Sequence, residues 1–177
     1  VAAVALPATI LKIADVIDNP WQMAVDRSKK AGVGKIDLGG GGCTMCDEQC
    51  LTIAAMNVVA YSCGCLVVWS CLQELNERGK HGLVDNVVLM GAPISTEETW
   101  EWKNAANVVS GRFVNCYTPN DWVLAFVYRL HSLATNVAGL EAVSGLGKRI
   151  ENIQVDIDGH TKYPYAIKDI MDQIKLE

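Results

Sequence analysis

Residues 56–64 read Met-Asn-Val-Val-Ala-Tyr-Ser-Cys-Gly. The short apolar run at residues 56–60 is typical of a buried strand, and residues 61–64 have the composition of a tight turn. Residues 66–75 are apolar on most sides of a helical period, which predicts a buried helix that ends near Gly79. Because a strand that turns directly into a helix opens a βαβ unit, we expect an α/β fold.

Short strands and helices alternate over the rest of the chain. Runs of β-branched or aromatic residues, bounded by turn residues, predict further strands at residues 87–90, 112–117 and 153–157. Helices are predicted at residues 3–18, 21–31, 97–109 and 122–133, and an amphipathic helix with Pro164 in its first turn closes the chain. This alternation implies a mainly parallel sheet of about four strands, flanked by helices and joined by right-handed crossovers.

Composition restricts the class of protein. The chain has 177 residues, half of them hydrophobic, and a formal net charge of -5. It is therefore expected to fold around a core, and without a basic stripe it is not expected to bind nucleic acid. The apolar run at residues 1–11 is shorter than the roughly 20 residues that cross a bilayer. Because the chain begins with Val, we expect it to be a piece of a longer protein.

Residues 32–56 differ from the rest because they are rich in Gly and Cys. Gly-rich segments lose much entropy on ordering, so we expect a loop or a divergent insertion here. No Gly-Lys-Ser/Thr follows the glycines, which argues against a phosphate-binding loop.

The seven cysteines are expected to be reduced thiols in the cytosol, because their number is odd and most lie on apolar segments. Cys43 and Cys46 form a C-x-x-C motif with Cys50 nearby, but no second pair stands at zinc-ribbon spacing. A thiol or metal site at these three positions is the less favoured alternative. It predicts bound zinc in the purified protein.

Three polar residues follow predicted strands: Ser62, Asp121 and His160. The carboxyl ends of parallel strands meet at one edge of a sheet, where ligands bind. The order Ser, Asp, His along the chain is that of an α/β-hydrolase triad. In such a triad the imidazole takes the proton of the serine hydroxyl, and the carboxylate orients the imidazole. We therefore predict Ser62 as nucleophile, His160 as general base and Asp121 as the residue that orients it, with no cofactor or metal required.

Each of these residues also has a purely structural interpretation. Ser62 and Asp121 could each cap the helix that follows, and His160 could be an ordinary loop residue. The turn itself favours a nucleophile, because small residues, Ala60 and Gly64, stand two positions before and after the serine. This is a variant of the Gly-x-Ser-x-Gly elbow. The backbone N–H of Cys63 would then lie at a helix N-terminus and is the predicted oxyanion donor.

Several short motifs resemble one protein family. They are Gly91-Ala92-Pro93, Val109-Ser110-Gly111-Arg112, Asn120-Asp121-Trp122, Val137-Ala138-Gly139-Leu140 and Asp158-Gly159-His160. Together with residues 5–8 and 19–21, these motifs resemble the DUF726 family of the α/β-hydrolase superfamily, which includes the transmembrane and coiled-coil domain-containing protein 4 of animals. The resemblance covers most of residues 3–31 and 57–175. It implies that residues 1–177 are the C-terminal portion of a single α/β-hydrolase-like domain.

The resemblance also implies a serine hydrolase of esterase or lipase type, acting on an ester or lipid at the cytoplasmic face of a membrane. Membrane association would come from hydrophobic segments upstream of this chain. Ser62 matches the nucleophile motif of the family, Asp121 its Asn/Gly-Asp-Trp motif and His160 its Gly-His motif.

Two departures from the family pattern support an alternative. The family typically has Gly-Tyr/Phe-Ser-Leu-Gly-Ala-Arg, whereas residues 60–66 here read Ala-Tyr-Ser-Cys-Gly-Cys-Leu. The upstream loop that gives the second oxyanion N–H in the family is expected to be absent from this chain. Loss of one such donor costs about 10²–10³ in rate. The alternative is a catalytically weak or inactive hydrolase-fold scaffold in membrane trafficking or protein interaction.

Overall fold

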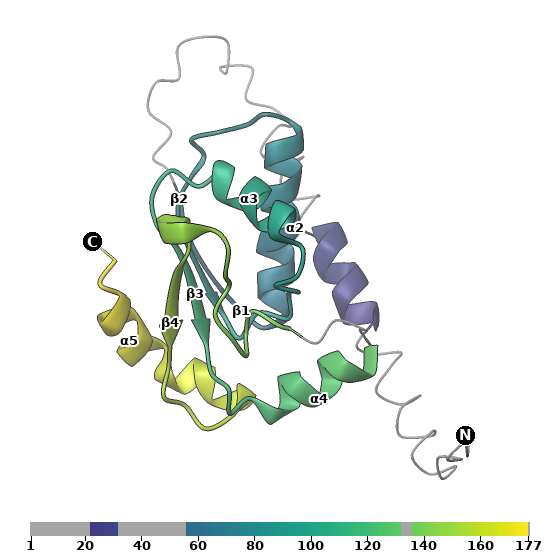
Figure 1. Cartoon of the computed structure of the whole chain (residues 1–177), viewed down its shortest axis with the longest axis vertical. Coiled ribbons are helices and arrows are strands. Elements are labelled where there is room, and N and C mark those ends of the chain that lie inside the picture. The colour runs from purple at the N-terminus through teal and green to yellow at the C-terminus, as the bar shows by residue number, and fades with distance from the viewer. Residues whose placement is uncertain (1–21, 32–55, 132–135, 177) are drawn as a thin grey trace.

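A computed structural model describes residues 22–31, 56–131 and 136–176 of the chain (Figure 1). A helix occupies residues 22–31. The further elements, in chain order, are β1 (Met56–Tyr61), α2 (Cys63–Glu77), β2 (Val84–Met90), α3 (Thr99–Asn107), β3 (Phe113–Tyr117), α4 (Trp122–His131), the 3₁₀ helix η1 (Gly147–Arg149), β4 (Glu151–Gln154), the 3₁₀ helix η2 (His160–Lys162) and α5 (Tyr163–Ile174).

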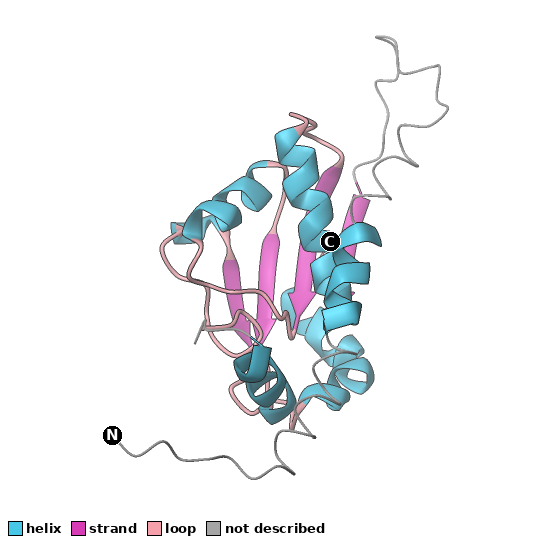
Figure 2. Ribbon diagram, turned by 90° about the vertical axis from the view of Figure 1, so that its right-hand side faces the viewer, coloured by secondary structure: helices cyan, strands magenta, loops and turns pink. Residues whose placement is uncertain are grey.

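The described strands form one sheet in the order β1-β2-β3-β4, and every neighbouring pair is parallel. Val87 of β2 pairs with Val58 of β1 on one side and with Phe113 of β3 on the other. Helices connect the first three strands, and helices cover both faces of the sheet (Figure 2). The prediction of an α/β fold with a mainly parallel sheet is therefore confirmed.

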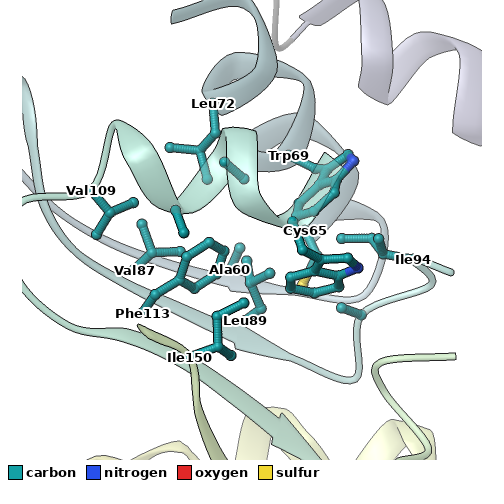
Figure 3. Close-up of a cluster of buried hydrophobic side chains, with 14 of the residues drawn as sticks. Ala60, Cys65, Trp69, Leu72, Val87, Leu89, Ile94, Val109, Phe113 and Ile150 are labelled. Carbon is teal, nitrogen blue, oxygen red and sulfur yellow. The ribbon is translucent and has the colours of Figure 1, made fainter. Parts of the chain in front are cut away.

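The alternation of side chains along β2 creates two cores. Val87 and Leu89 belong to a cluster with Trp69 of α2 and Trp102 of α3, whose rings lie 4.4 Å apart between centroids (Figure 3). Val88 and Met90 point to the opposite face and pack in a second cluster with Tyr163, Ile170 and Ile174 of α5. Strands buried on both faces read as continuous apolar runs, which is why residues 87–90 gave a clear strand signal.

The last strand begins two residues and ends three residues earlier than predicted. Glu151–Gln154 of β4 pair with residues 114–117 of β3, and the final bond runs from the Val155 N–H to the Tyr117 carbonyl over 2.9 Å. Since β3 ends at Tyr117, β4 has no partner beyond that point. The apolar residues Ile153, Val155 and Ile157 produced the predicted strand at 153–157, but they are spaced to pack under α5 rather than to extend the ladder.

Two motifs of the family pattern, Gly91-Ala92-Pro93 and Val137-Ala138-Gly139-Leu140, meet at the carboxyl ends of β2 and β3. The Gly139 N–H donates to the Ala92 carbonyl over 2.9 Å, and the Gly139 carbonyl accepts from the Thr118 N–H over 3.1 Å. A Cβ at Gly139 would lie 2.5 Å from a methyl of Leu124 and 2.6 Å from the carbonyl carbon of Gly91. Only glycine allows the backbone to approach this closely, and the contact holds the two strand ends together.

Three predictions fall on residues that the structure does not describe. These are the helix at 3–18, nearly all of the 32–56 insertion with its cysteines Cys43, Cys46 and Cys50, and the end of the helix at 122–133. Within residues 22–31, 56–131 and 136–176, no group of three His, Cys, Asp or Glu side chains could hold a metal ion.

Candidate active site

The carboxyl edge of the sheet brings together the three residues predicted from the sequence. Ser62 follows β1, Asp121 follows β3, and His160 begins η2 after β4. His160 Nε2 lies 2.7 Å from Ser62 Oγ, and His160 Nδ1 lies 2.5 Å from Asp121 Oδ2. With Nδ1 protonated, the imidazole donates to the carboxylate and accepts from the serine hydroxyl. This is the hydrogen-bond arrangement that a serine nucleophile requires.

Ser62 stands in a strained turn between β1 and α2. Its φ is 53° and its ψ is -128°, a conformation that non-glycine residues rarely adopt. The Ser62 N–H donates to the Met90 carbonyl over 3.0 Å, and the Ser62 carbonyl accepts from the Cys65 N–H over 2.9 Å. The side chain makes no capping bond to α2. Ser62 is therefore the N-cap residue of α2 by position, but its side chain does not cap the helix, and its hydroxyl lies against His160 instead.

Asp121 makes the hydrogen bonds expected of both interpretations considered for it. Its Oδ1 accepts the Leu124 N–H over 2.9 Å and so caps α4, while Oδ2 binds His160. The residue is fully buried, with 0% of its surface exposed. A buried carboxylate is costly unless it is paired and hydrogen-bonded, and both of its oxygens have a partner here.

Tyr61, the last residue of β1, holds the loop that carries His160. Its hydroxyl donates to the His160 carbonyl over 2.6 Å, and the two rings lie 5.0 Å apart between centroids. Burial raises the pKa of Tyr61, so its hydroxyl remains a donor. Sequence reasoning placed Tyr61 in the turn but missed this contact, because 99 positions separate the two residues.

Gly91 lies close to the imidazole of His160. A Cβ at this position would meet His160 Cε1 at 3.5 Å and the Tyr163 ring at 3.0 Å, and its φ of 56° also favours glycine. The Gly91-Ala92-Pro93 motif thus leaves room for the two aromatic rings that line the candidate site.

Cys63 is the first residue of α2, where a backbone N–H has no acceptor within the helix. This N–H is therefore available for the oxyanion role predicted for it, which stays a prediction. Burial raises the pKa of the Cys63 thiol, so it is protonated at neutral pH. The thiolate is the reactive form of cysteine, so the neighbouring serine is the better candidate nucleophile.

The parallel sheet and the residues at its carboxyl edge define an α/β-hydrolase-like protein. The family described as "Protein of unknown function (DUF726)" matches residues 1–177, so the chain belongs to the DUF726 family. The family membership predicted from the sequence motifs is confirmed by this match. No solved structure matches the chain significantly.

Curated relatives carry names of several kinds. The chain is 37% identical over 180 residues to the transmembrane and coiled-coil domain-containing protein STS1 of rice, covering 99% of the chain and 25% of that protein. It is 33% identical over 175 residues to the uncharacterized membrane protein C6F6.13c of Schizosaccharomyces pombe, covering 96% and 28%. It is 32% identical over 182 residues to the probable lipase MIL1 of Saccharomyces cerevisiae, covering 99% and 16%.

The chain therefore spans between 16% and 28% of the length of these relatives. Two of them are named for a membrane or a transmembrane domain. Among the residues that the structure describes, no helix is both long and apolar enough to cross a bilayer.

Proposed function

We propose that this chain carries the catalytic triad of a serine hydrolase that cleaves carboxylic esters through an acyl-enzyme on Ser62. The observation that carries the proposal is the continuous line of hydrogen bonds from Ser62 through His160 to the buried Asp121. The relative named as a probable lipase supports an ester or a lipid as the substrate class.

The first half of the reaction forms the acyl-enzyme. Ser62 Oγ attacks the ester carbonyl carbon while its proton passes to His160 Nε2, 2.7 Å away. The negative charge on the carbonyl oxygen is stabilised by N–H donors, of which the Cys63 N–H is one. The bond to the alcohol oxygen then breaks, and the alcohol leaves with the proton from His160. Asp121 stabilises the imidazolium through Nδ1.

The second half returns the enzyme to its starting state. Water attacks the acyl carbon and gives a proton to His160 Nε2. The bond between the acyl carbon and Ser62 Oγ breaks, the carboxylic acid departs, and Oγ regains the proton from His160. The bond from the Tyr61 hydroxyl to the His160 carbonyl supports both halves, since it fixes the backbone that carries the base.

The cellular setting is also part of the proposal. Among the described residues, Cys63, Cys65 and Cys116 are free thiols, which supports a reducing compartment. With the names of the relatives, this favours action at the cytoplasmic face of a membrane, with the present chain as the C-terminal portion of a larger hydrolase domain.

Labelling with a fluorophosphonate probe tests the proposal. We expect covalent labelling of the wild-type chain and none in Ser62→Ala or His160→Ala. The matched controls are Ser70→Ala, at a serine on α2, and His81→Ala, at an exposed histidine away from the site, and both should label normally. A chain that is folded by circular dichroism but does not label would contradict the enzyme and favour the scaffold alternative.

A further inference from the structure

A pocket of about 280 Å³ lies among the helix of residues 22–31, α2, α3, α4 and the loop between β2 and α3. Its buried lining residues are all apolar: Leu66, Trp69, Pro93 and Ile94. Val25 and Tyr128 complete the apolar part and are half-buried. The remaining lining residues are polar and less buried, so the pocket has an apolar interior and a polar rim.

The wall of the pocket on α2 begins one helical turn after Ser62. Leu66 and Trp69 are three positions apart, so they share one face of α2. At 1.5 Å per residue, Leu66 lies about 6 Å and Trp69 about 10 Å beyond Ser62 along the helix axis. The pocket therefore lies close to the serine along α2.

The loop on the other side of the pocket is also tied to the candidate site. Met90 accepts the Ser62 N–H, and Gly91 lies against the His160 ring. Pro93 and Ile94 follow directly and line the pocket. In Figure 3, Ile94 and Trp69 lie at the same end of the core cluster as Cys65, one turn before Trp69 on α2.

We infer that this pocket binds the acyl chain of the substrate and that it selects short acyl chains over long ones. The inference rests on the proposed function, because it places the ester carbonyl at Ser62 Oγ. The buried lining residues are all apolar, and the charged lining residues, Lys29 and Glu101, lie on the less buried rim, so the interior suits an apolar chain. Ligand pockets for larger molecules measure roughly 300–1,000 Å³, and this one is below that range.

Filling the pocket from the helix of residues 22–31 tests the inference with little risk to the core. Val25 is half-buried and lines the pocket, whereas Met23 lies on the same helix, is 44% exposed and does not line it. Val25→Trp should lower kcat/KM for p-nitrophenyl butyrate about tenfold, the size of effect that small changes in an apolar pocket produce. The acetate ester should be affected much less, and the control Met23→Trp should match the wild type with both esters.

The wild type should also prefer p-nitrophenyl butyrate to the palmitate ester. Equal losses of butyrate and acetate hydrolysis in Val25→Trp, or a preference for palmitate in the wild type, would overturn the inference.

A binding measurement separates the pocket from the chemistry. Saturation-transfer NMR would follow methyl hexanoate with Ser62→Ala, which cannot form an acyl-enzyme, and with the same variant carrying Val25→Trp or Met23→Trp. Signal that is lost only with Val25→Trp supports the pocket. No signal with Ser62→Ala, or signal that survives Val25→Trp, overturns it. Ester binding in a chain that does not label with fluorophosphonate would contradict the proposed function while leaving an apolar binding site.

Discussion

Asp121 at the carboxyl edge of the sheet and Glu151 at its amino edge each pair with a basic side chain, in opposite surroundings. The Asp121 side chain is fully buried and its partner His160 is 14% exposed. The Glu151 side chain is 41% exposed, and its partner Arg112 is 36% exposed. Arg112 contacts both oxygens of Glu151, at 2.8 and 2.7 Å, and also donates to the Ile174 carbonyl over 2.8 Å at the end of α5.

The difference separates a structural pair from a candidate catalytic one. An exposed ion pair contributes about 0–1 kcal/mol and costs little to keep, so the pair at the amino edge needs no explanation beyond joining β3, β4 and α5. Burial of a carboxylate costs several kcal/mol before pairing. The carboxyl edge combines that cost with a strained backbone at Ser62, and such combinations cluster at functional sites.

Asp121→Asn tests the difference between the two edges with the largest expected effect. An amide keeps the shape and an acceptor oxygen for the Leu124 N–H, so the cap of α4 should survive. It cannot stabilise the imidazolium or hold the required tautomer, and this change lowers the rate of a serine triad about 10⁴-fold. The rate of fluorophosphonate labelling measures the loss. Asp156→Asn, at an exposed carboxylate four residues before His160, should label at the wild-type rate. Normal labelling of Asp121→Asn would show that Asp121 does not belong to the triad.

Tyr61→Phe should have a smaller effect at the same edge. The variant keeps the ring against His160 but loses the 2.6 Å bond to its carbonyl. A hydrogen bond of this kind contributes about 1 kcal/mol, so we expect labelling to slow by about tenfold at most. Tyr163→Phe is the matched control, since that ring also faces His160 but its hydroxyl makes only a 3.5 Å contact with the Cys116 carbonyl. Equal rates for both variants would show that the bond from Tyr61 does not position the base.

The sequence was informative where one short segment carries the signal. Apolar runs followed by turn residues predicted β2 and β3, because these strands are largely buried on both faces. The parallel arrangement then predicted that the residues after the strands would meet, and Ser62, Asp121 and His160 do meet. Their catalytic roles stay a prediction.

The sequence was less informative where two distant segments determine the result. The length of β4 depends on where β3 ends, and the contact between Tyr61 and His160 depends on two strand ends. Helix α2 begins at Cys63, ahead of the predicted helix at 66–75, because the single residue Ser62 completes the turn with a positive φ. A local pattern contains none of this information.

Arg112→Met tests the amino edge, where the expected effect is smallest. The variant loses the contacts to both Glu151 oxygens and to the end of α5, and because the pair is well exposed to solvent, the free energy of unfolding should fall by only about 1 kcal/mol. Lys168→Met is the control, since its pair with Asp172 is even more exposed, at 84% and 65%, and its loss should not be measurable.

The effect of Arg112→Met should also depend on pH in a defined direction. The hydrogen bonds from Arg112 lower the pKa of Glu151 below its ordinary value of 4.5. A carboxyl whose pKa is lowered by folding stabilises the protein above its ordinary pKa, and that contribution is lost as the pH falls through the lower, folded value. Urea unfolding should therefore show the full difference between wild type and variant at pH 7 and a shrinking one below pH 4.5. Fluorophosphonate labelling at pH 7 should stay unchanged, because the pair lies at the opposite edge of the sheet from Ser62. Slower labelling in a fully folded Arg112→Met variant would show that the two edges are coupled and that the distinction between them fails.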